Sequence, residues 1–189
     1  MEMNEQNASE SPPQAGGFVF AFDLKSWFRD ILLAFAIAIF LVVFVVQPVK
    51  VEGTSMQPRL ADQERIFINR FIYHFKGISR GDVVVFWYPK DRSKSFIKRV
   101  LGVPGDKVEI ISGDVFINNI RVEEPYVTPE YRDFQSYGLE VVPPGCYFVL
   151  GDHRNSSNDS RKWGFVAKEL IYGKAMFGYW PVSRVGIVE

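Results

Sequence analysis

Residues 108–122 read VEIISGDVFINNIRV, and this stretch alternates short runs of β-branched and aromatic residues with polar turn sequences. The turn sequences are Ser112-Gly113-Asp114 and Asn118-Asn119. Glycine and asparagine adopt the positive φ that tight hairpin turns need, whereas most other residues do so only at an energetic cost. We therefore predict consecutive β-hairpins over this stretch.

The same pattern continues on both sides of these hairpins. Further short β-branched and aromatic runs are separated by Gly-Asp, Pro-Gly and Pro-Pro-Gly sequences, which are typical of turns. After residue 50 we find no long segment with a hydrophobic period of 3.6 residues, and no internal repeat. This part of the chain is therefore predicted to be mainly β, with further strands at 83–87, 96–101, 147–150 and 174–179.

The N-terminal region has a different composition. Residues 31–46 are sixteen consecutive residues drawn only from Ile, Leu, Ala, Phe and Val. As a helix they would extend about 24 Å, which is near the lower limit for crossing a bilayer. We therefore predict a single-pass membrane anchor over residues 25–48, preceded by a disordered polar tail over residues 1–24.

Two other interpretations of the apolar run were weighed. A fully buried core helix without any polar face would be unusual in a domain of this size. A cleavable signal peptide would need a small-x-small cleavage site, and none follows residue 46 directly. Two basic residues before the run and three after it are too evenly divided to predict its orientation in a membrane.

Charge and cysteine content exclude several classes of function. The 189 residues include 22 Lys and Arg and 22 Asp and Glu, a balance that disfavours a nucleic-acid partner bound through its phosphates. The lone Cys146 excludes an intrachain disulfide and a multi-cysteine zinc site. With only two histidines, we predict no metal and no cofactor. Residues 49–189 are predicted to form one β-rich domain, and beyond residue 30 the net charge is +3, from 20 basic and 17 acidic residues.

A serine follows the predicted anchor closely, at Ser55 in the sequence GTSM of residues 53–56. A serine hydroxyl is a poor nucleophile unless a base takes its proton, so on this fragment alone an ordinary loop serine is the simpler interpretation. Histidine is the usual base, and the chain offers His74 in an aromatic stretch and His153 in a polar loop. Neither has the sequence surroundings of a triad histidine, although triads are recognised by geometry.

Lysine is the other possible base. Strand alternation over residues 95–101 places Lys98 on one face and Arg99 on the other, so that each face carries a cation among apolar neighbours. From the residues alone, a Lys98 that extends its amine outward from an edge strand is the favoured interpretation. Burial of the amine would instead lower its pKa from about 10.4 by up to several units, which would make it a neutral base near physiological pH.

Four segments behind the predicted anchor resemble, in order and spacing, the motifs of bacterial type I signal peptidases. They are SMQP at 55–58, RGDVVVF at 80–86, FIKRVLGVPGD at 96–106 and GDHRNSSNDSR at 151–161. The resemblance extends from about residue 25 to the C-terminus. Each motif is weakly specific by itself, whereas the ordered set of four is a specific signal.

This resemblance implies a serine endopeptidase that uses a Ser–Lys dyad. Ser55 would be the nucleophile, with its backbone N–H helping to hold the oxyanion, and Lys98 would be the general base. Ser157 would orient the lysine amine, and an ion pair between Asp159 and Arg161 would brace the site. The matched motifs also assign supporting positions, which are Gly53, Met56, Pro58, Gly151 and Asp152.

The resemblance also implies a fold, a location and partners. The fold would be mainly β, an antiparallel sheet that is partly open and barrel-like, with an apolar surface that faces the membrane. The catalytic domain would lie on the extracytoplasmic side of the cell membrane, or of a thylakoid membrane if the source has one. Its partners would be the lipid bilayer and preproteins whose signal peptides carry small residues before the cleavage site.

Several positions depart from the family pattern. Gly53 stands where many relatives carry a serine whose hydroxyl contacts the oxyanion, so only the backbone is available here. Arg59 replaces a usual threonine, while His153 and Asn155 replace asparagine and aspartate in the last motif. Residues 113–145 are few, so a second β region inserted there should be small or absent.

Three alternative functions stay open. A self-cleaving repressor protease also uses a Ser–Lys pair on a related β core, but the anchor and the lack of a helix-turn-helix pattern argue against it. A membrane-anchored, non-catalytic β module that binds exported polypeptides would keep its function in Ser55→Ala and Lys98→Ala variants. A Ser-His-Asp hydrolase would need His74 or His153 beside the serine.

Overall fold

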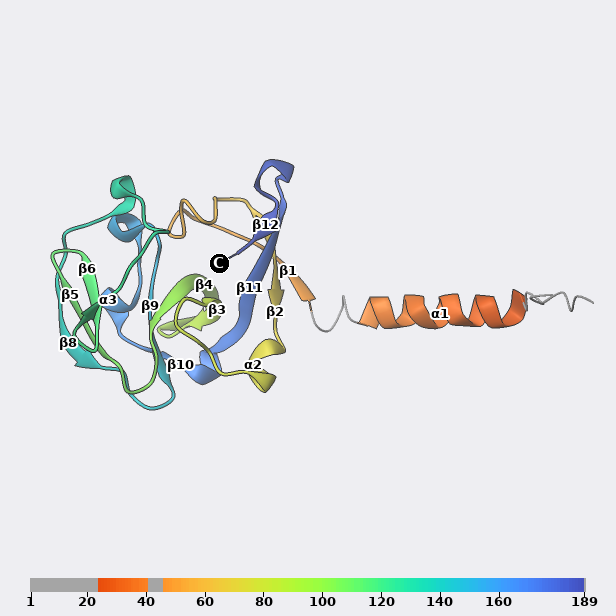
Figure 1. The fold of residues 1–189 in the computed structure, drawn as a ribbon, viewed down its shortest axis with the longest axis horizontal. Helices are drawn as coiled ribbons and strands as arrows, with labels where there is room; N and C mark the ends of the chain where they lie inside the picture. The colour runs from red at the N-terminus through yellow and green to blue at the C-terminus, as the bar shows by residue number, and fades with distance from the viewer. Residues whose placement is uncertain (1–23, 41–45, 189) are drawn as a thin grey trace, which may run out of the picture. The chain divides into compact units, whose positions relative to one another are not determined.

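The computed structural model describes residues 24–40 and 46–188, and the chain divides after Ala38 into two units that are described separately (Figure 1). The first unit contains most of helix α1 (Leu24–Phe40), and the second contains all the described strands. The predicted disordered tail, residues 1–24, lies outside the described residues except for Leu24.

Helix α1 has 17 residues, and its large apolar side chains from Leu24 to Ile39 are between 47% and 72% exposed. Among the residues that the structure describes, no helix combines the length and the apolarity needed to cross a bilayer. Of the predicted anchor, residues 25–40 are helical and residues 41–45 lie outside the described part of the chain. Residues 46–48 are not helical, because they pair with residues 67–69 in a β-ladder. Pro48 has no N–H to donate, but at the edge of a sheet this is tolerated.

The second unit is built around an eight-stranded antiparallel sheet. Its strands follow the order β1-β2-β11-β3-β4-β9-β10, and β12 pairs with β11. Because β1 and β10 lie at the two ends of this order without pairing, the sheet is open. The strands are β1 (Val46–Lys50), β2 (Arg65–Asn69), β3 (Val83–Tyr88), β4 (Asp91–Gly102), β9 (Cys146–Leu150), β10 (Val166–Ala167), β11 (Ile171–Trp180) and β12 (Gly186–Ile187).

A second, four-stranded sheet follows β4 along the chain, in the order β7-β6-β5-β8. Its strands are β5 (Lys107–Ile111), β6 (Asp114–Ile117), β7 (Ile120–Arg121) and β8 (Tyr137–Val141). The predicted hairpins are confirmed, and the turn residues Ser112, Asn118 and Asn119 have φ values of 50°, 53° and 67°. The second β region around 113–145 was expected to be small or absent, and the structure has this four-stranded sheet there, which begins earlier, at Lys107.

The remaining elements are short. The second unit contains two helices of four residues and four 3-10 turns in its described part. They are α2 (Ile72–Phe75), η2 (Pro129–Tyr131), η3 (Arg154–Ser156), α3 (Ser160–Trp163), η4 (Lys168–Leu170) and η5 (Val182–Arg184). The absence of a longer helix in residues 46–188 agrees with the lack of helical periodicity after residue 50.

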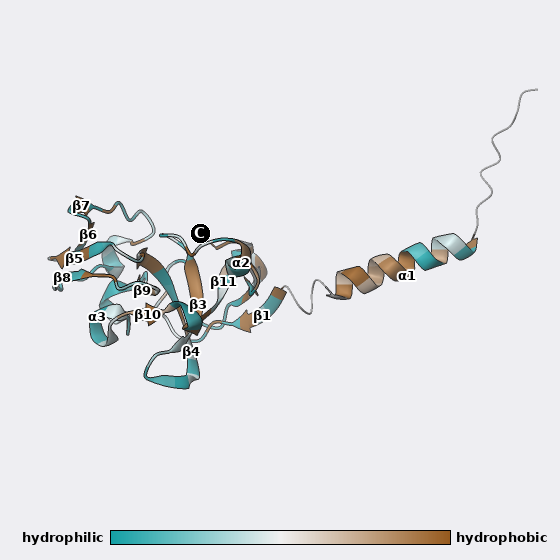
Figure 2. Ribbon diagram, turned by 90° about the horizontal axis from the view of Figure 1, so that it is seen from below, coloured by the Kyte–Doolittle hydropathy of each residue, from teal (hydrophilic) through white to brown (hydrophobic). Residues whose placement is uncertain are grey.

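Three clusters of buried apolar residues form the core of the second unit. Strand β3 lies in the middle of the main sheet and contributes to two of them, and Figure 2 shows it as a strongly hydrophobic strand. Its first four residues, 83–86, are all at most 1% exposed. A strand covered on both faces is continuously apolar. The prediction of a mainly β, antiparallel domain is confirmed.

Candidate active site

Ser55 lies in the turn that connects β1 to β2. The next residue, Met56, is 2% exposed and packs into the core, and its carbonyl accepts a hydrogen bond from Leu60 N–H at 2.8 Å. Gly53 has a φ of +94°, a conformation that favours glycine, and its N–H donates to Asp62 Oδ1 at 2.7 Å. These contacts hold the half-buried Ser55 in a defined position.

The C-terminal segment holds the other end of this turn. Arg184 donates to the carbonyl oxygens of Pro58 and Arg59 at 2.7 and 3.1 Å and pairs with the buried carboxylate of Glu64. The Arg59 guanidinium donates to the carbonyl of Ile187. The sequence offered no role for Arg59, and the structure shows that it ties the Ser55 turn to β12.

Lys98 is 4% exposed in β4, and its Nζ donates a hydrogen bond to Ser55 Oγ across 2.6 Å. The interpretation favoured by the residues alone, an amine extended into solvent, is therefore wrong. Residues 95–98 pair with β3 on one side only, because β9 pairs with β4 from Arg99 onward. The turn that carries Ser55 covers the lysine, and this cover comes from a segment 43 residues away in the sequence.

Burial lowers the pKa of Lys98 to about 8, from 10.5 for a free lysine side chain. The carboxylates of Asp159 and Asp152 oppose this shift, and the positive charge of Arg161 adds to it. Desolvation disfavours the ammonium form because the low-dielectric interior replaces water around the charge. The neutral amine is therefore far more populated near neutral pH than in a free lysine side chain, although the ammonium form still predominates below pH 8.

The segment after β9 lies directly against the Ser55 turn. His153 N–H donates to the carbonyl oxygen of Ser55 at 3.1 Å. At Gly151, a Cβ would lie 2.3 Å from Ser157 Oγ and 2.5 Å from the Ser55 carbonyl oxygen, so no larger residue fits without a shift of the backbone. Gly151 thus allows this segment, residues 151–161, to approach the serine closely.

Asp159 and Arg161 form the expected ion pair. The guanidinium donates from Nε and Nη2 to the two carboxylate oxygens, both at 2.8 Å, and Asp159 is fully buried. Burial opposes ionisation, but the Arg161 guanidinium outweighs it and holds the pKa of the Asp159 carboxyl below its usual value. Asp159 also accepts a hydrogen bond from Gly151 N–H at 3.1 Å, which links the ion pair to the close approach at Gly151.

The hydrogen bond expected between Ser157 and the Lys98 amine is not present. Ser157 is 5% exposed, and among the described residues no hydrogen bond joins its Oγ to the Lys98 amine. The lysine amine is directed instead to Ser55, and Ser157 packs against Gly151.

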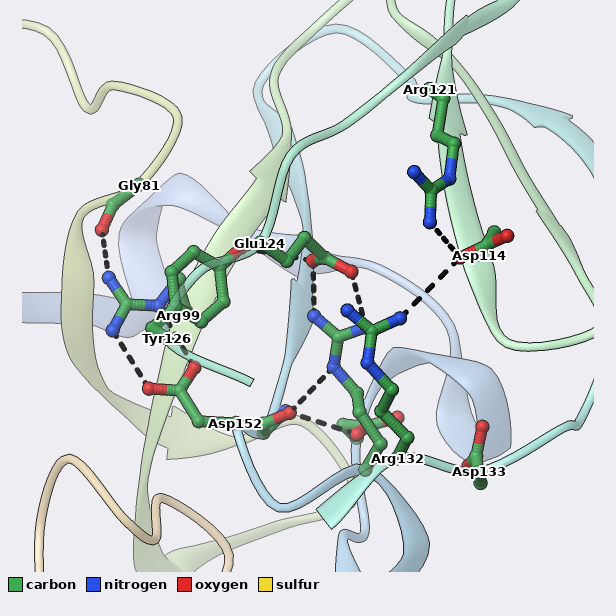
Figure 3. Close-up of polar contacts among 12 residues, drawn as sticks. Gly81, Arg99, Asp114, Arg121, Glu124, Tyr126, Arg132, Asp133 and Asp152 are labelled. Carbon is green, nitrogen blue, oxygen red and sulfur yellow. Dashed lines mark hydrogen bonds and ion pairs between the residues drawn. The ribbon is translucent and has the colours of Figure 1, made fainter. Parts of the chain in front are cut away.

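On the opposite face of β4, Arg99 is also buried, at 2% exposure. Its Nε and Nη2 donate to the two carboxylate oxygens of Asp152 at 2.9 and 2.8 Å, and its Nη1 donates to the Gly81 carbonyl at 3.0 Å. Figure 3 shows Arg99 between Gly81 and Asp152, with the ring of Tyr126 beside it at 4.0 Å from Cζ to the ring centroid. The motifs assigned a supporting position to Asp152, and its partner is this arginine.

Two carboxylates from the segment between β7 and β8 hold residues 151–161, and sequence reasoning missed both. Glu124 pairs with the buried guanidinium of Arg154, including one contact of 2.9 Å, and Asp133 pairs with Arg161. Asn155 adds a hydrogen bond to the carbonyl of Glu130 at 3.0 Å. Nothing in the local sequence around these acidic residues distinguishes them from solvated ones, so only the fold identifies them.

A cavity of about 730 Å³ opens in front of Ser55 and Lys98. Residues 49–56 bound it on one side and residues 93–98 on the other. Val49, Val51, Val85 and Ile97 give it an apolar lining, and the side formed by residues 93–98 belongs to strand β4. An apolar lining with a few polar groups is the usual form of a ligand-binding site.

Neither histidine lies where a triad would need it. His153 places Nδ1 3.1 Å from the carbonyl oxygen of Thr54 and its ring against Tyr131, while the Ser55 hydroxyl is bound by Lys98. His74 lines a different cavity, beside α2. Among the described residues, no cluster of three or more His, Cys, Asp or Glu side chains could hold a metal ion.

Comparison with known sequences finds one family over most of the chain. The family profile described as signal peptidase, peptidase S26, matches residues 24–180. The probable signal peptidase I-2 of Synechocystis sp. is 36% identical over an alignment of 190 residues. The alignment covers 95% of this chain and 80% of that protein. The signal peptidase IB of Staphylococcus aureus strain Mu50 is 36% identical over 178 residues, which cover 86% of this chain and 92% of that protein.

Comparison with solved structures finds a signal peptidase I from Enterococcus faecalis V583. It is 30% identical in sequence, and the superposition has a TM-score of 0.47. The match covers 52% of this chain and 97% of the other.

Proposed function

Because this chain belongs to the signal peptidase family, peptidase S26, it is a serine endopeptidase, and we propose that it removes signal peptides from exported preproteins with a Ser–Lys dyad. Ser55 is the nucleophile and Lys98 the general base. The observation that carries this proposal is the 2.6 Å hydrogen bond between Lys98 Nζ and Ser55 Oγ, made by an amine that is 4% exposed.

The proposed reaction begins with the neutral form of Lys98. In this form Nζ has a lone pair and accepts the proton of the Ser55 hydroxyl while Oγ attacks the carbonyl carbon of the scissile bond. The ammonium then gives the proton to the leaving amine, and an acyl-enzyme remains on Ser55. The amine next takes a proton from an attacking water, and the ester is hydrolysed.

The backbone N–H of Ser55 is the donor that we assign to the oxyanion, and no hydrogen bond among the described residues occupies it. Gly53 has no side chain to add a second donor. One oxyanion donor contributes about 3–4 kcal/mol to lowering the barrier in other serine proteases. The supporting residues then act by position: Gly151, Asp159 and Arg161 hold residues 151–161 against the Ser55 turn.

The cleft beside the dyad supports a peptide substrate in extended conformation. The strand edges at residues 49–51 and 93–97 have no strand partner on the cleft side in the described structure, so they offer backbone donors and acceptors. The apolar lining suits the small residues that precede a signal-peptide cleavage site. Backbone pairing gives affinity for any sequence, and shallow pockets select small side chains.

We further propose that the chain is anchored in the cell membrane, or in a thylakoid membrane if the source has one, with the second unit on the extracytoplasmic side. The sixteen apolar residues 31–46 and the exposed apolar side chains of α1 support an anchor. The second unit adds exposed apolar side chains near its C-terminus, at Met176, Phe177, Trp180, Val182, Val185 and Ile187. The substrate's own apolar segment would then lie in the same bilayer.

Incubation of the detergent-solubilised protein with a preprotein, followed by sequencing of the new N-terminus, tests the proposal. The wild type should release a mature protein cut after small residues, while Ser55→Ala and Lys98→Ala should fold and release none. Activity retained by both variants would favour a non-catalytic binding module with a contaminating protease. Cleavage within the chain itself, and not in the preprotein, would favour a self-cleaving protease.

A further inference from the structure

A second cavity, of about 850 Å³, lies beside α2 and shares no lining residue with the cleft that contains Ser55. Its rim carries the exposed cations Arg70 and Lys168 and the exposed imidazole of His74. Its floor is apolar, formed by Ile78 and Ile171, which are 7% and 9% exposed. The mechanism proposed for Ser55 uses none of these residues.

The strand register places this cavity next to the end of the apolar run. Val46 is the last apolar residue of that run and the first residue of β1, and it pairs directly with Asn69. Opposed residues of an antiparallel pair have their Cα atoms about 5 Å apart. Arg70 and Phe71 therefore lie within two residues of the point at which the chain leaves its apolar run. If that run crosses the bilayer, as proposed above, the cavity lies at the level of the lipid headgroups.

The segment that forms the rim is held in place before any ligand binds. Asn69 Oδ1 accepts hydrogen bonds from the N–H groups of Phe71 and Ile72 at 2.8 and 2.9 Å. The Arg70 guanidinium lies over the ring of Tyr172, with 6.0 Å between Cζ and the ring centroid. A cation that is already oriented loses less conformational freedom when it binds an anion.

The charge of the cavity favours an anion. Arg70 and Lys168 are basic side chains, and Glu169 is the one carboxylate in the described lining. Tyr73 also lines the cavity, and its hydroxyl donates to Asp82, whose carboxylate is paired with Lys174. Asp82 is therefore neutralised by its own partner and does not offset the cations on the rim.

We propose that this cavity binds the phosphate headgroup of an anionic phospholipid. Arg70 and Lys168 pair with the phosphate oxygens, as guanidinium and ammonium groups do in other phosphate sites. Phe71 and Phe75, which are 40% and 85% exposed, contact the glycerol and upper acyl region, where aromatic side chains concentrate in membrane proteins. The lipid would hold the second unit at a constant height above the bilayer. This inference rests on the membrane anchoring that is part of the proposed function.

Native mass spectrometry of the full chain in detergent can measure binding of dioctanoyl phosphatidylglycerol, dioctanoyl phosphatidylcholine and inorganic phosphate. The wild type should bind phosphatidylglycerol at least tenfold more tightly than either of the other two probes. The double variant Arg70→Gln/Lys168→Gln should lose at least tenfold of this affinity, and Arg70→Lys should keep most of it. The matched control Lys107→Gln/Lys162→Gln removes two exposed cations elsewhere and should stay within twofold of the wild type.

Three outcomes would overturn the proposal. Equal losses in the two double variants would mean that the lipid responds only to net charge. If phosphatidylcholine bound as tightly as phosphatidylglycerol, the site would not require an anionic lipid. If inorganic phosphate bound as tightly as phosphatidylglycerol, the site would recognise phosphate and not a lipid. Arg70 and Lys168 are exposed, so the thermal unfolding midpoints of all variants should agree and a loss of folding would be visible.

Two further measurements separate this inference from the proposed function. Ser55→Ala should bind the lipid like the wild type, and Arg70→Gln/Lys168→Gln should cleave a soluble peptide in detergent with an unchanged kcat. Alkaline extraction of membranes tests the anchor directly, because an anchored chain stays in the pellet with or without the lipid site. Failure of catalysis, of anchoring or of lipid binding would thus each give a different pattern.

Discussion

The two faces of β4 each bury one cation, and they treat its charge in opposite ways. On one face, Arg99 is held by both oxygens of Asp152 and lies over Tyr126. On the other, Lys98 faces the hydroxyl of Ser55, and the carboxylates that act on its charge have partners of their own. Consecutive residues with nearly equal burial therefore differ in their chemistry because only one has a dedicated counter-ion.

The comparison shows what burial alone does. Removing a cation from water costs several kcal/mol, and an ion pair with good geometry offsets this cost. Arginine stays protonated in either environment, whereas lysine can give up its proton. Asp159 and Asp152 raise the pKa of Lys98 less than burial lowers it, since Arg161 and Arg99 already pair with them. The pKa of Lys98 falls to about 8 as a result, so the neutral form that a general base needs is reached at a lower pH than in a free lysine.

The largest expected effect comes from making the two faces alike. Lys98→Arg would place a permanent cation beside Ser55, and kcat/KM should fall by about 10³-fold or more because no neutral base remains. Cleavage of a preprotein under single-turnover conditions measures the loss. Lys107→Arg, at an exposed lysine of β5 that does not line the cleft, should stay within twofold. A Lys98→Arg variant with more than a tenth of wild-type activity would contradict the assigned base.

Removing the counter-ion from the other face should mainly affect stability. Asp152→Asn leaves Arg99 charged and buried without a carboxylate, and the free energy of unfolding should fall by about 3–5 kcal/mol. The control Asp114→Asn breaks a pair whose side chains are 39% and 48% exposed, and it should cost less than about 1 kcal/mol. Urea unfolding of the solubilised protein measures both changes. Similar losses of unfolding free energy in the two variants would mean that the buried Arg99–Asp152 pair contributes no more stability than the exposed pair of Asp114.

The pH dependence of kcat/KM should report the ionisation of Lys98 alone. Below pH 8 the ammonium form of Lys98 dominates, so kcat/KM should rise about tenfold per pH unit and level off above a pKa of about 8. Because the pKa is lower in the folded state than the 10.5 of the unfolded chain, the unfolded chain binds more protons between these values. The contribution of Lys98 to the free energy of unfolding therefore increases as pH rises from about 8 to 10.5. In Lys98→Met this increase of the free energy of unfolding with pH should be absent. A flat activity profile from pH 6 to 10 in a folded protein would sink the assignment.

The smallest expected effect concerns the aromatic rings next to each cation. Lys98 Nζ lies 5.4 Å from the ring centroid of Phe96, and the ring favours the ammonium form. Phe96→Leu should lower the apparent pKa of the pH–activity profile by about half a unit. Tyr126→Leu changes the ring under Arg99, so it should leave this pKa in place and cost about 1 kcal/mol of stability. An equal pKa shift in both variants would mean that the two faces are not independent.

Much of the fold was predictable where the signal is local. The hairpins of β5, β6 and β7 follow from Ser112-Gly113 and Asn118-Asn119, whose backbone preferences act within two residues. Strands such as β1, β2 and β8 were missed, because they are short and their pairing partners lie elsewhere in the chain. Residues 46–48 were assigned to the anchor because Val46 is the last residue of the apolar run and Gln47-Pro48 marks its end.

The candidate site divides in a similar way. The order of motifs in the sequence predicted Ser55, Lys98, Asp159 and Arg161 as one group. In the structure Lys98 bonds to Ser55, and Arg161 pairs with Asp159. Glu124 and Asp133 were not predicted, and the expected contact of Ser157 with the lysine was wrong. Such contacts depend on how the segment between β7 and β8 lies over residues 151–161, and no residue pattern reports that.

Composition, turn residues and motif order by themselves determined a β-rich chain behind an apolar segment and the family to which it belongs. The tertiary structure alone decided that Arg99 has a carboxylate partner and that the pKa of Lys98 is lowered. Chain-local preferences act over a few residues and can be read in order, whereas the pKa of a buried amine depends on every segment that displaces water around it. For Lys98 those segments are the Ser55 turn and residues 151–161, which only the folded chain brings to it.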